Sequence, residues 1–173
     1  NAAIHTRAQD DFKLRGMGCT LDVALIRGGG VFTAHVGDSR IYILRSGTVY
    51  QLTEDHTFAQ MLLANGVLSK EEVAKHPQRN MLTRGLGPFP SVQVDSAFFE
   101  LDAGDVFLLC SDGLYVEVPE ERIAALLTQP PETATRELIQ AGLEAGGRDN
   151  MTAVVFQVMQ SPQQQLGIIG AEK

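Results

Sequence analysis

Four short segments between residues 21 and 52 place the strongest constraint on how this chain can fold. They are rich in aliphatic and aromatic side chains and occupy residues 21–26, 31–36, 41–45 and 48–52. Short turns separate them, including Gly28-Gly29 and the two-residue turn Ser46-Gly47. Parallel neighbours in a sheet need a crossover of roughly a dozen residues or more, so strands on such short turns must be largely antiparallel.

Helical patterns predominate in the middle of the chain, and strands return late. Helices are predicted over residues 2–12, 57–64, 69–76, 119–127 and 132–145, and further strands over residues 92–101, 106–110 and 151–158. This grouping is typical of an α+β layered domain rather than of alternating βαβ units. In the last helix, the side chains predicted to point inward are Ala134, Leu138, Ile139 and Leu143.

The run at residues 106–113 combines a buried strand with an acid. Its apolar part predicts a strand buried on both faces, and Asp112 is predicted to lie in the turn at the carboxyl end. Asp38 follows the strand predicted over residues 31–36, and Asp149 lies just before the last strand. Because Mg²⁺ and Mn²⁺ prefer oxygen ligands, usually a few from protein and several from water, these acids suggest a divalent-cation site.

Each of these aspartates also has a purely structural interpretation. Asp38 and Asp112 could cap backbone amides in turns. Asp149 and Asn150 could form a tight turn after the glycines that end the preceding helix. The residues alone leave these alternatives open.

The histidines and cysteines predict no competing site. His35 is expected on a sheet face and His76 at a helix end. His56 is expected to be a cap at a helix start, and the alternative is a contact with a residue that binds the metal. The sequence contains no zinc-ligand spacing, and Cys19 and Cys110 form neither a disulfide framework nor a zinc motif. Cys110 is expected to be a buried, reduced thiol.

Composition narrows the class of protein further. At 173 residues with 44% hydrophobic side chains, the chain is about one domain long and can bury a core. The formal charge of -7 argues against nucleic acid as a partner. No apolar run approaches the roughly 18 residues of a membrane span, and a cytoplasmic setting is expected. The first residue is Asn1 rather than Met, so the chain is expected to be a fragment or a processed product.

Taken together and in order, eight segments resemble the PPM, or PP2C, metal-dependent serine/threonine protein phosphatases in their bacterial form. The segments are residues 16–20 (GMGCT), 36–42 (VGDSRIY), 52–56 (LTEDH), 76–80 (HPQRN), 82–87 (LTRGLG), 104–105 (GD), 108–114 (LLCSDGL) and 147–152 (GRDNMT). The resemblance covers residues 1–158 as one phosphatase domain, and residues 159–173 are expected to be a flexible tail.

The resemblance implies a four-layer α-β-β-α sandwich of antiparallel sheets flanked by helices. It implies attack of metal-activated water on phosphoserine or phosphothreonine in a protein, with Mn²⁺ or Mg²⁺ as cofactor and two to three ions in the complete site. The implied partner is a phosphoprotein substrate, with the enzyme opposing a Ser/Thr kinase.

Roles follow from the resemblance residue by residue. Asp112 and Asp149 are similar to the catalytic ligands of the core metal pair, and Gly113 is expected to be a further metal-binding residue. Asp38 is similar to a ligand of an additional, weaker metal that is shared with Asp112. Three further residues are expected to support the site: Ser39, Arg40 and Asn150.

The sequence departs from the family at its beginning. The family's Arg-x-x-Asn-Glu-Asp strand and its Asp-Gly-x-Gly-Gly motif, which supplies the bridging aspartate, have no counterpart here. The chain is therefore expected to start after those strands, which would leave a sheet edge unpaired. Two alternatives to an enzyme are a catalytically dead, phosphoprotein-binding or regulatory module of this fold and a regulatory domain whose aspartates only form turns.

Overall fold

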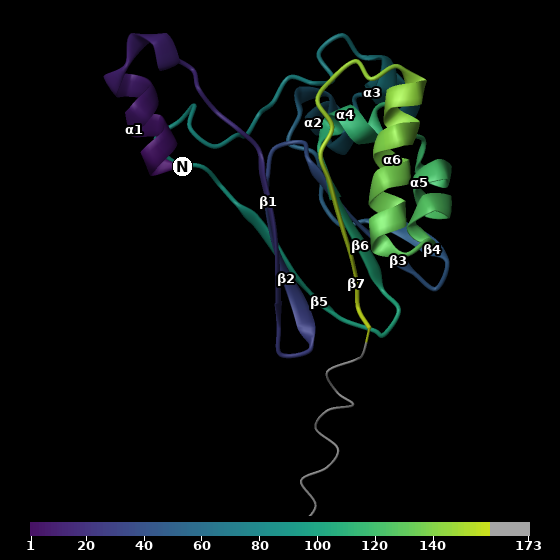
Figure 1. The fold of residues 1–173 in the computed structure, drawn as a ribbon. Coiled ribbons are helices and arrows are strands. Elements are labelled where there is room, and N and C mark those ends of the chain that lie inside the picture. Colours follow the sequence, from purple (N-terminus) through teal and green to yellow (C-terminus); the bar gives the residue numbers. More distant parts are fainter. Residues whose placement is uncertain (160–173) are drawn as a thin grey trace, which may run out of the picture. The chain divides into compact units, whose positions relative to one another are not determined.

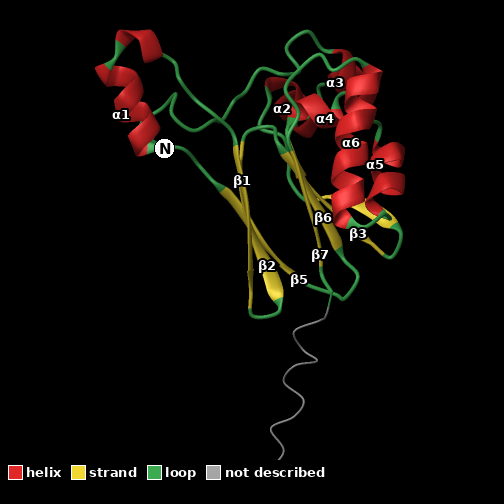
Figure 2. Ribbon diagram, in the orientation of Figure 1, coloured by secondary structure: helices red, strands yellow, loops and turns green. Residues whose placement is uncertain are grey.

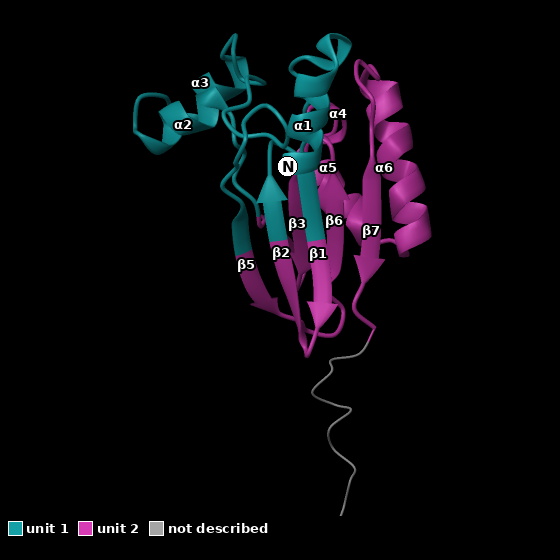
Figure 3. Cartoon of the chain, turned by 90° about the vertical axis from the view of Figure 1, so that its left-hand side faces the viewer, with its two compact units in different colours: residues 1–23, 34–39, 53–96 teal, residues 24–33, 40–52, 97–173 magenta. Residues whose placement is uncertain are grey.

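The computed structural model describes residues 1–159, and the chain divides into two compact units. Unit 1 comprises residues 1–23, 34–39 and 53–96, and unit 2 comprises residues 24–33, 40–52 and 97–173 (Figure 3). The tail predicted over residues 159–173 lies, apart from Met159, outside the described residues. In the described part of the chain, no helix combines the length and the apolar character needed to cross a membrane.

Helices and strands occur in the predicted order (Figures 1 and 2). The helices are α1 (Ala2–Asp10), the 3-10 helix η1 (Phe12–Leu14), α2 (Phe58–Ala64), α3 (Lys70–Lys75), α4 (Asp112–Tyr115), α5 (Glu120–Leu127) and α6 (Pro131–Ala145). The strands are β1 (Leu21–Arg27), β2 (Gly30–Val36), β3 (Arg40–Arg45), β4 (Thr48–Gln51), β5 (Asp95–Glu100), β6 (Val106–Cys110) and β7 (Ala153–Gln157).

The predicted strand over residues 106–110 lies inside a four-stranded sheet that belongs wholly to unit 2. The order is β4-β3-β6-β7, and all three pairings are antiparallel, as predicted for β3 and β4. Arg40 pairs with Cys110 on one side of β6, and Ala153 pairs with Cys110 on the other. The second sheet has the order β1-β2-β5. The four early strands are therefore two hairpins that belong to different sheets.

Both faces of β6 are buried, which explains its uninterrupted apolar sequence. Leu108 faces a cluster formed with helices α4, α5 and α6, of which α5 and α6 cover this face of the sheet (Figure 1). Phe107 faces the opposite cluster and stacks on Phe156 with ring centroids 4.8 Å apart. Both side chains are 0% exposed, and burial of each contributes roughly 1.5–3 kcal/mol. This buried strand therefore gives the segment that begins at Ser111 a rigid support.

Two predictions about the helices need correction. Asp112 does not lie in a turn but is the first residue of helix α4, because an acid is favourable in a helix's first turn. Leu143 was predicted inward but is 57% exposed, and Gly142 takes the buried position instead. A Cβ atom at Gly142 would lie 2.4 Å from the sulfur of Met151, so a larger residue there would require the Met151 side chain to move.

Other local predictions hold. Ser69 and Glu72 form a capping box at the start of α3, and His76 is the residue at its carboxyl-terminal cap, as predicted. Cys110 is buried and Cys19 is exposed, and the two do not form a disulfide.

Candidate functional site

Asp112 and Asp149 come together because β6 and β7 are antiparallel neighbours. Asp112 follows the end of β6, and Asp149 precedes the start of β7. The pairing of Cys110 with Ala153 places that end and that start at the same edge of the sheet. Strand topology thus brings together two acids that are far apart in the sequence.

A glycine lets the two segments approach closely. A Cβ atom at Gly113 would lie 2.4 Å from the carbonyl oxygen of Asn150 and 3.3 Å from Cβ of Asp149. The Ser111 hydroxyl joins the same segments, since it donates to the Asn150 carbonyl at 3.3 Å and accepts from the Thr152 amide at 3.0 Å. Sequence reasoning missed this structural role of Ser111.

Among residues 1–159, the carboxylates of this pair accept hydrogen bonds only from adjacent amides. Asp112 Oδ1 accepts from the Gly113 amide at 2.9 Å, and Asp149 Oδ1 accepts from the Asn150 amide at 2.7 Å. Within residues 1–159, neither carboxylate forms an ion pair with a lysine, arginine or histidine. The remaining acceptor capacity of two neighbouring carboxylates can bind a cation from outside the chain.

The nearest arginine in the sequence is engaged elsewhere. Arg148 donates to the Glu117 carboxylate at 2.6 and 3.1 Å. This hydrogen-bonded pair lowers the pKa of Glu117 and raises that of Arg148, so both groups stay charged. The positive charge of Arg148 is therefore matched by Glu117 rather than by the adjacent Asp149.

The donor set suits a hard cation that keeps most of its water. Across residues 1–159, no three His, Cys, Asp or Glu side chains are grouped so that they could hold a metal ion by themselves. Two carboxylates fit the partial protein coordination that Mg²⁺ and Mn²⁺ accept, whereas a structural zinc site needs four nitrogen or sulfur donors.

Arg40 supports helix α4. Its guanidinium lies 3.7 Å from the centroid of the Tyr115 ring and donates to the Tyr42 hydroxyl at 2.8 Å. Tyr115 is the last residue of the helix that Asp112 begins. A cation over an aromatic face is worth about 0.5–2 kcal/mol, so Arg40 helps to fix the helix that carries the acid.

Asp38 and Ser39 belong to unit 1, in the loop that follows β2. Asp38 is 8% exposed. The preceding residue, Gly37, has φ +121°, and a Cβ atom there would lie 2.2 Å from Cγ2 of Thr20. The Ser39 and Thr20 hydroxyls are hydrogen-bonded at 2.8 Å. The loop around Asp38 therefore has one tightly defined shape.

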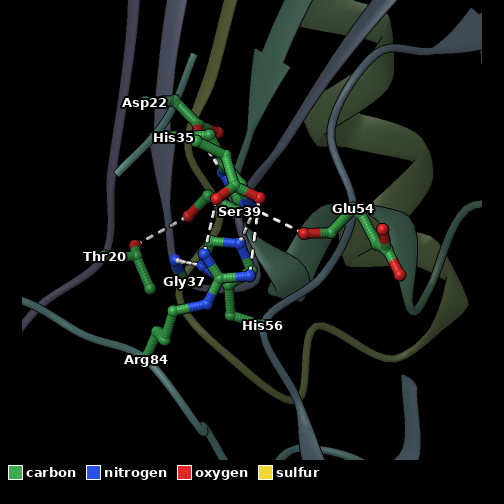
Figure 4. Close-up of polar contacts among 9 residues, drawn as sticks. Thr20, Asp22, His35, Gly37, Ser39, Glu54, His56 and Arg84 are labelled. Atoms are coloured by element: carbon green, nitrogen blue, oxygen red, sulfur yellow. Dashed lines mark hydrogen bonds and ion pairs between the residues drawn. The ribbon is translucent and has the colours of Figure 1, made fainter. Parts of the chain in front are cut away.

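The histidines of unit 1 lie in a network that sequence reasoning missed (Figure 4). His56 does not cap α2, because the Thr57 hydroxyl is the cap, accepting from the Gln60 amide. His56 instead contacts Gly37 and Asp95, and His35 contacts Asp22. One indication was present in the sequence: Asp22 interrupts an aliphatic strand, opposite a hairpin partner that contains His35.

Comparison with known proteins places this geometry in context. The sequence model of the family Protein phosphatase 2C matches residues 2–61. The serine/threonine protein phosphatase PstP of Mycobacterium tuberculosis is 42% identical over 161 residues, 92% of this chain and 31% of PstP. The serine/threonine phosphatase stp of Listeria welshimeri is 38% identical over 159 residues, 91% of this chain and 63% of that protein. The chain thus spans less than two thirds of the length of these relatives.

Solved structures agree with the sequence matches. The crystal structure of the Mycobacterium tuberculosis phosphatase PstP/Ppp has a TM-score of 0.85 and 39% identity, covering 92% of this chain and 68% of that chain. A structure of the PstP catalytic domain in complex with 2 manganese ions has a TM-score of 0.83 and 37% identity, covering 92% and 66%. The predicted α+β fold of antiparallel sheets and helices is confirmed.

Proposed function

The chain belongs to the PP2C, or PPM, family of bacterial serine/threonine protein phosphatases, and on this premise we propose that it hydrolyses phosphoserine and phosphothreonine in proteins. The substrate would be the product of a Ser/Thr kinase. The observation that carries the proposal is the meeting of Asp112 and Asp149 at one sheet edge, without a cationic partner among residues 1–159.

Asp112 and Asp149 are the proposed catalytic residues and the ligands of Mn²⁺ or Mg²⁺, with Asp38 as a ligand of an additional ion. Two to three ions would complete the site. When bound, such ions activate water as a nucleophile near neutral pH and neutralise charge on the phosphoryl group. The manganese-bound structure of PstP supports the choice of metal.

The remaining residues of the proposed site act on the shape of the site rather than on the phosphate. Gly113 admits the Asp149 segment, and Asn150 presents the carbonyl that the Ser111 hydroxyl holds. Arg40 fixes α4 through Tyr115. Together they keep two carboxylates adjacent despite their mutual repulsion.

The decisive experiment is release of phosphate from a phosphothreonine peptide, with Mn²⁺ or with a chelator, by this chain and by the complete product of its gene. We expect Mn²⁺-dependent release that is lost in Asp112→Asn and Asp149→Asn. The matched control is Asp102→Asn, which removes one negative charge from an aspartate whose side chain is 71% exposed.

Release that persists in both site variants would overturn the metal assignment. Tight binding of the phosphopeptide without hydrolysis by either protein would overturn the enzyme proposal and support a phosphoprotein-binding module.

A further inference from the structure

A cluster of charged side chains in unit 1 lies outside the acid pair on which the proposed function depends. This histidine cluster comprises His35, His56, Asp22, Asp95 and Arg84 (Figure 4). The two histidines are 3% and 2% exposed, and their ring centroids are 4.5 Å apart. Burial of two histidines in contact demands a defined protonation state for each.

The hydrogen-bond partners define those states. His35 faces two acceptors, with Nδ1 2.6 Å from Asp22 Oδ1 and Nε2 3.0 Å from the Glu54 carbonyl oxygen. Both of its nitrogens must donate, so the ring is a cation. His56 faces one donor and one acceptor: Nδ1 accepts from the Gly37 amide at 3.1 Å, which leaves Nε2 to donate to Asp95 Oδ2 at 3.0 Å. His56 is therefore neutral, in the Nε2–H tautomer.

The surrounding charges maintain this difference. Burial lowers the pKa of His35, but the hydrogen bond and charge of Asp22 outweigh it, with help from the Glu54 carbonyl and the Asp55 charge, and the pKa is raised. Burial lowers the pKa of His56, and the charges of His35 and Arg84 oppose the effect of Asp95. Burial, together with the charges of His35 and Arg84, thus keeps His56 neutral.

His56 holds the backbone that leads into Asp38. Besides accepting from the Gly37 amide, it donates its own amide to the Gly37 carbonyl at 2.7 Å. Its carbonyl accepts from the Thr83 amide at 2.8 Å, next to Arg84, whose guanidinium binds Asp95. These contacts form a closed network around His56 and fix its imidazole in position.

We propose that His56 is a positioning residue for Asp38: its neutral ring fixes Gly37, while the hydroxyl pair of Ser39 and Thr20 fixes the residue on the other side. Asp95 selects the tautomer, and burial beside the cationic His35 and Arg84 keeps the ring uncharged. The inference rests on the proposed function, since it concerns the ligand role given to Asp38.

The first test does not depend on activity. Nitrogen-15 spectra of the histidine rings should show that Nδ1 of His56 is unprotonated and coupled to the Gly37 amide at neutral pH, with the proton on Nε2. Asp95→Asn should alter this tautomer distribution. A proton on Nδ1 of His56 in the unmodified protein would overturn the proposal.

The second test separates the two ring nitrogens. In His56→Asn the side-chain oxygen takes the place of Nδ1 and can still accept from Gly37, whereas in His56→Gln the amide nitrogen takes the place of Nε2 and Gly37 loses its acceptor. We expect the Mn²⁺ concentration for half-maximal hydrolysis to rise about 10–100-fold in His56→Gln and much less in His56→Asn. An equal rise in both variants would overturn the positioning role.

Two controls make the outcome specific. His76 Nδ1 accepts from the Gln78 amide at the same 3.1 Å, so His76→Gln removes a matched hydrogen bond and should leave the Mn²⁺ requirement unchanged. The second control is the melting temperature, which should fall similarly in both His56 variants. A merely structural role of His56 would change the melting temperature without changing the Mn²⁺ requirement. If the unmodified protein releases no phosphate, the proposed function fails, and the ring spectra still decide the positioning inference.

Discussion

Two pairs of carboxylates, one pair in each unit, have opposite surroundings. In unit 1, the cationic His35 matches Asp22 and Arg84 matches Asp95, which also accepts a hydrogen bond from neutral His56. In unit 2, Asp112 and Asp149 accept only from adjacent amides and have no cationic partner within residues 1–159. The matched acids define the shape of a loop, whereas the unmatched pair is held together by Gly113 and Ser111 and can receive a cation from solution. The difference distinguishes structural acids from candidate ligands.

The largest effect is expected when the unmatched pair receives a cationic side chain of its own. Asp149→Lys would place an ammonium group beside Asp112, as Arg84 lies beside Asp95. We expect Mn²⁺-activated hydrolysis to fall by more than the roughly 10–100-fold that loss of an orienting partner costs. The melting temperature should be maintained or raised, because like-charge repulsion is replaced by attraction. Retained Mn²⁺ activation would show that Asp149 is not a ligand.

Gly113→Ala tests the packing that joins the acid pair. The added methyl group would lie 2.4 Å from the Asn150 carbonyl oxygen, so the Asp149 segment must shift. We expect a loss of stability of about 1–3 kcal/mol in denaturant unfolding, together with weaker Mn²⁺ binding. Gly85→Ala is the control, because its added methyl group would make only ordinary contacts, at 3.6 and 3.8 Å. Equal losses in both variants would contradict the close approach.

The matched acids of unit 1 predict opposite pH slopes for the two histidines. The pKa of His35 is raised above 6.5, so its stabilising contribution is complete below that pH and is lost as the pH rises through the raised pKa. The pKa of His56 is lowered, so stability falls as the pH drops below 6.5 toward the lowered pKa. Melting temperatures measured across pH should flatten on the alkaline side in His35→Asn and on the acidic side in His56→Asn. The reverse assignment would contradict the two protonation states.

The smallest effect is expected at the ion pair of Arg148 and Glu117 next to the acid pair, in which only the arginine is exposed. Arg148 is 73% exposed, and water and salt screen its attraction to Glu117. Arg148→Ala should change the melting temperature less than Gly113→Ala does. A large drop in Mn²⁺ affinity would instead show that the pair positions Asp149.

The sequence predicts most of this fold but only part of its polar architecture. Strand β6 was predictable because a short apolar run between Asp105 and Gly113 is typical of a buried strand. The position of Asp112 after the carboxyl end of this strand was predictable for the same reason. The allocation of four early strands to two sheets was not predictable, since pairing of β3 with β6 spans residues 40 to 110. His56 was taken for a cap because Thr57, one residue later, gives the same helix-start pattern. Its partner Asp95 lies 39 positions away, beyond any local pattern.

The central claim is most directly tested by direct titration of Mn²⁺, followed by electron paramagnetic resonance, into the unmodified protein, Asp112→Asn and Asp105→Asn. Asp105 is a buried acid of the same unit that Arg45 matches at 2.6 and 2.8 Å. The account predicts that Asp112→Asn loses high-affinity Mn²⁺ while folded Asp105→Asn retains it. Unchanged Mn²⁺ binding in Asp112→Asn, or equal loss in both variants, would contradict the distinction between unmatched and matched acids.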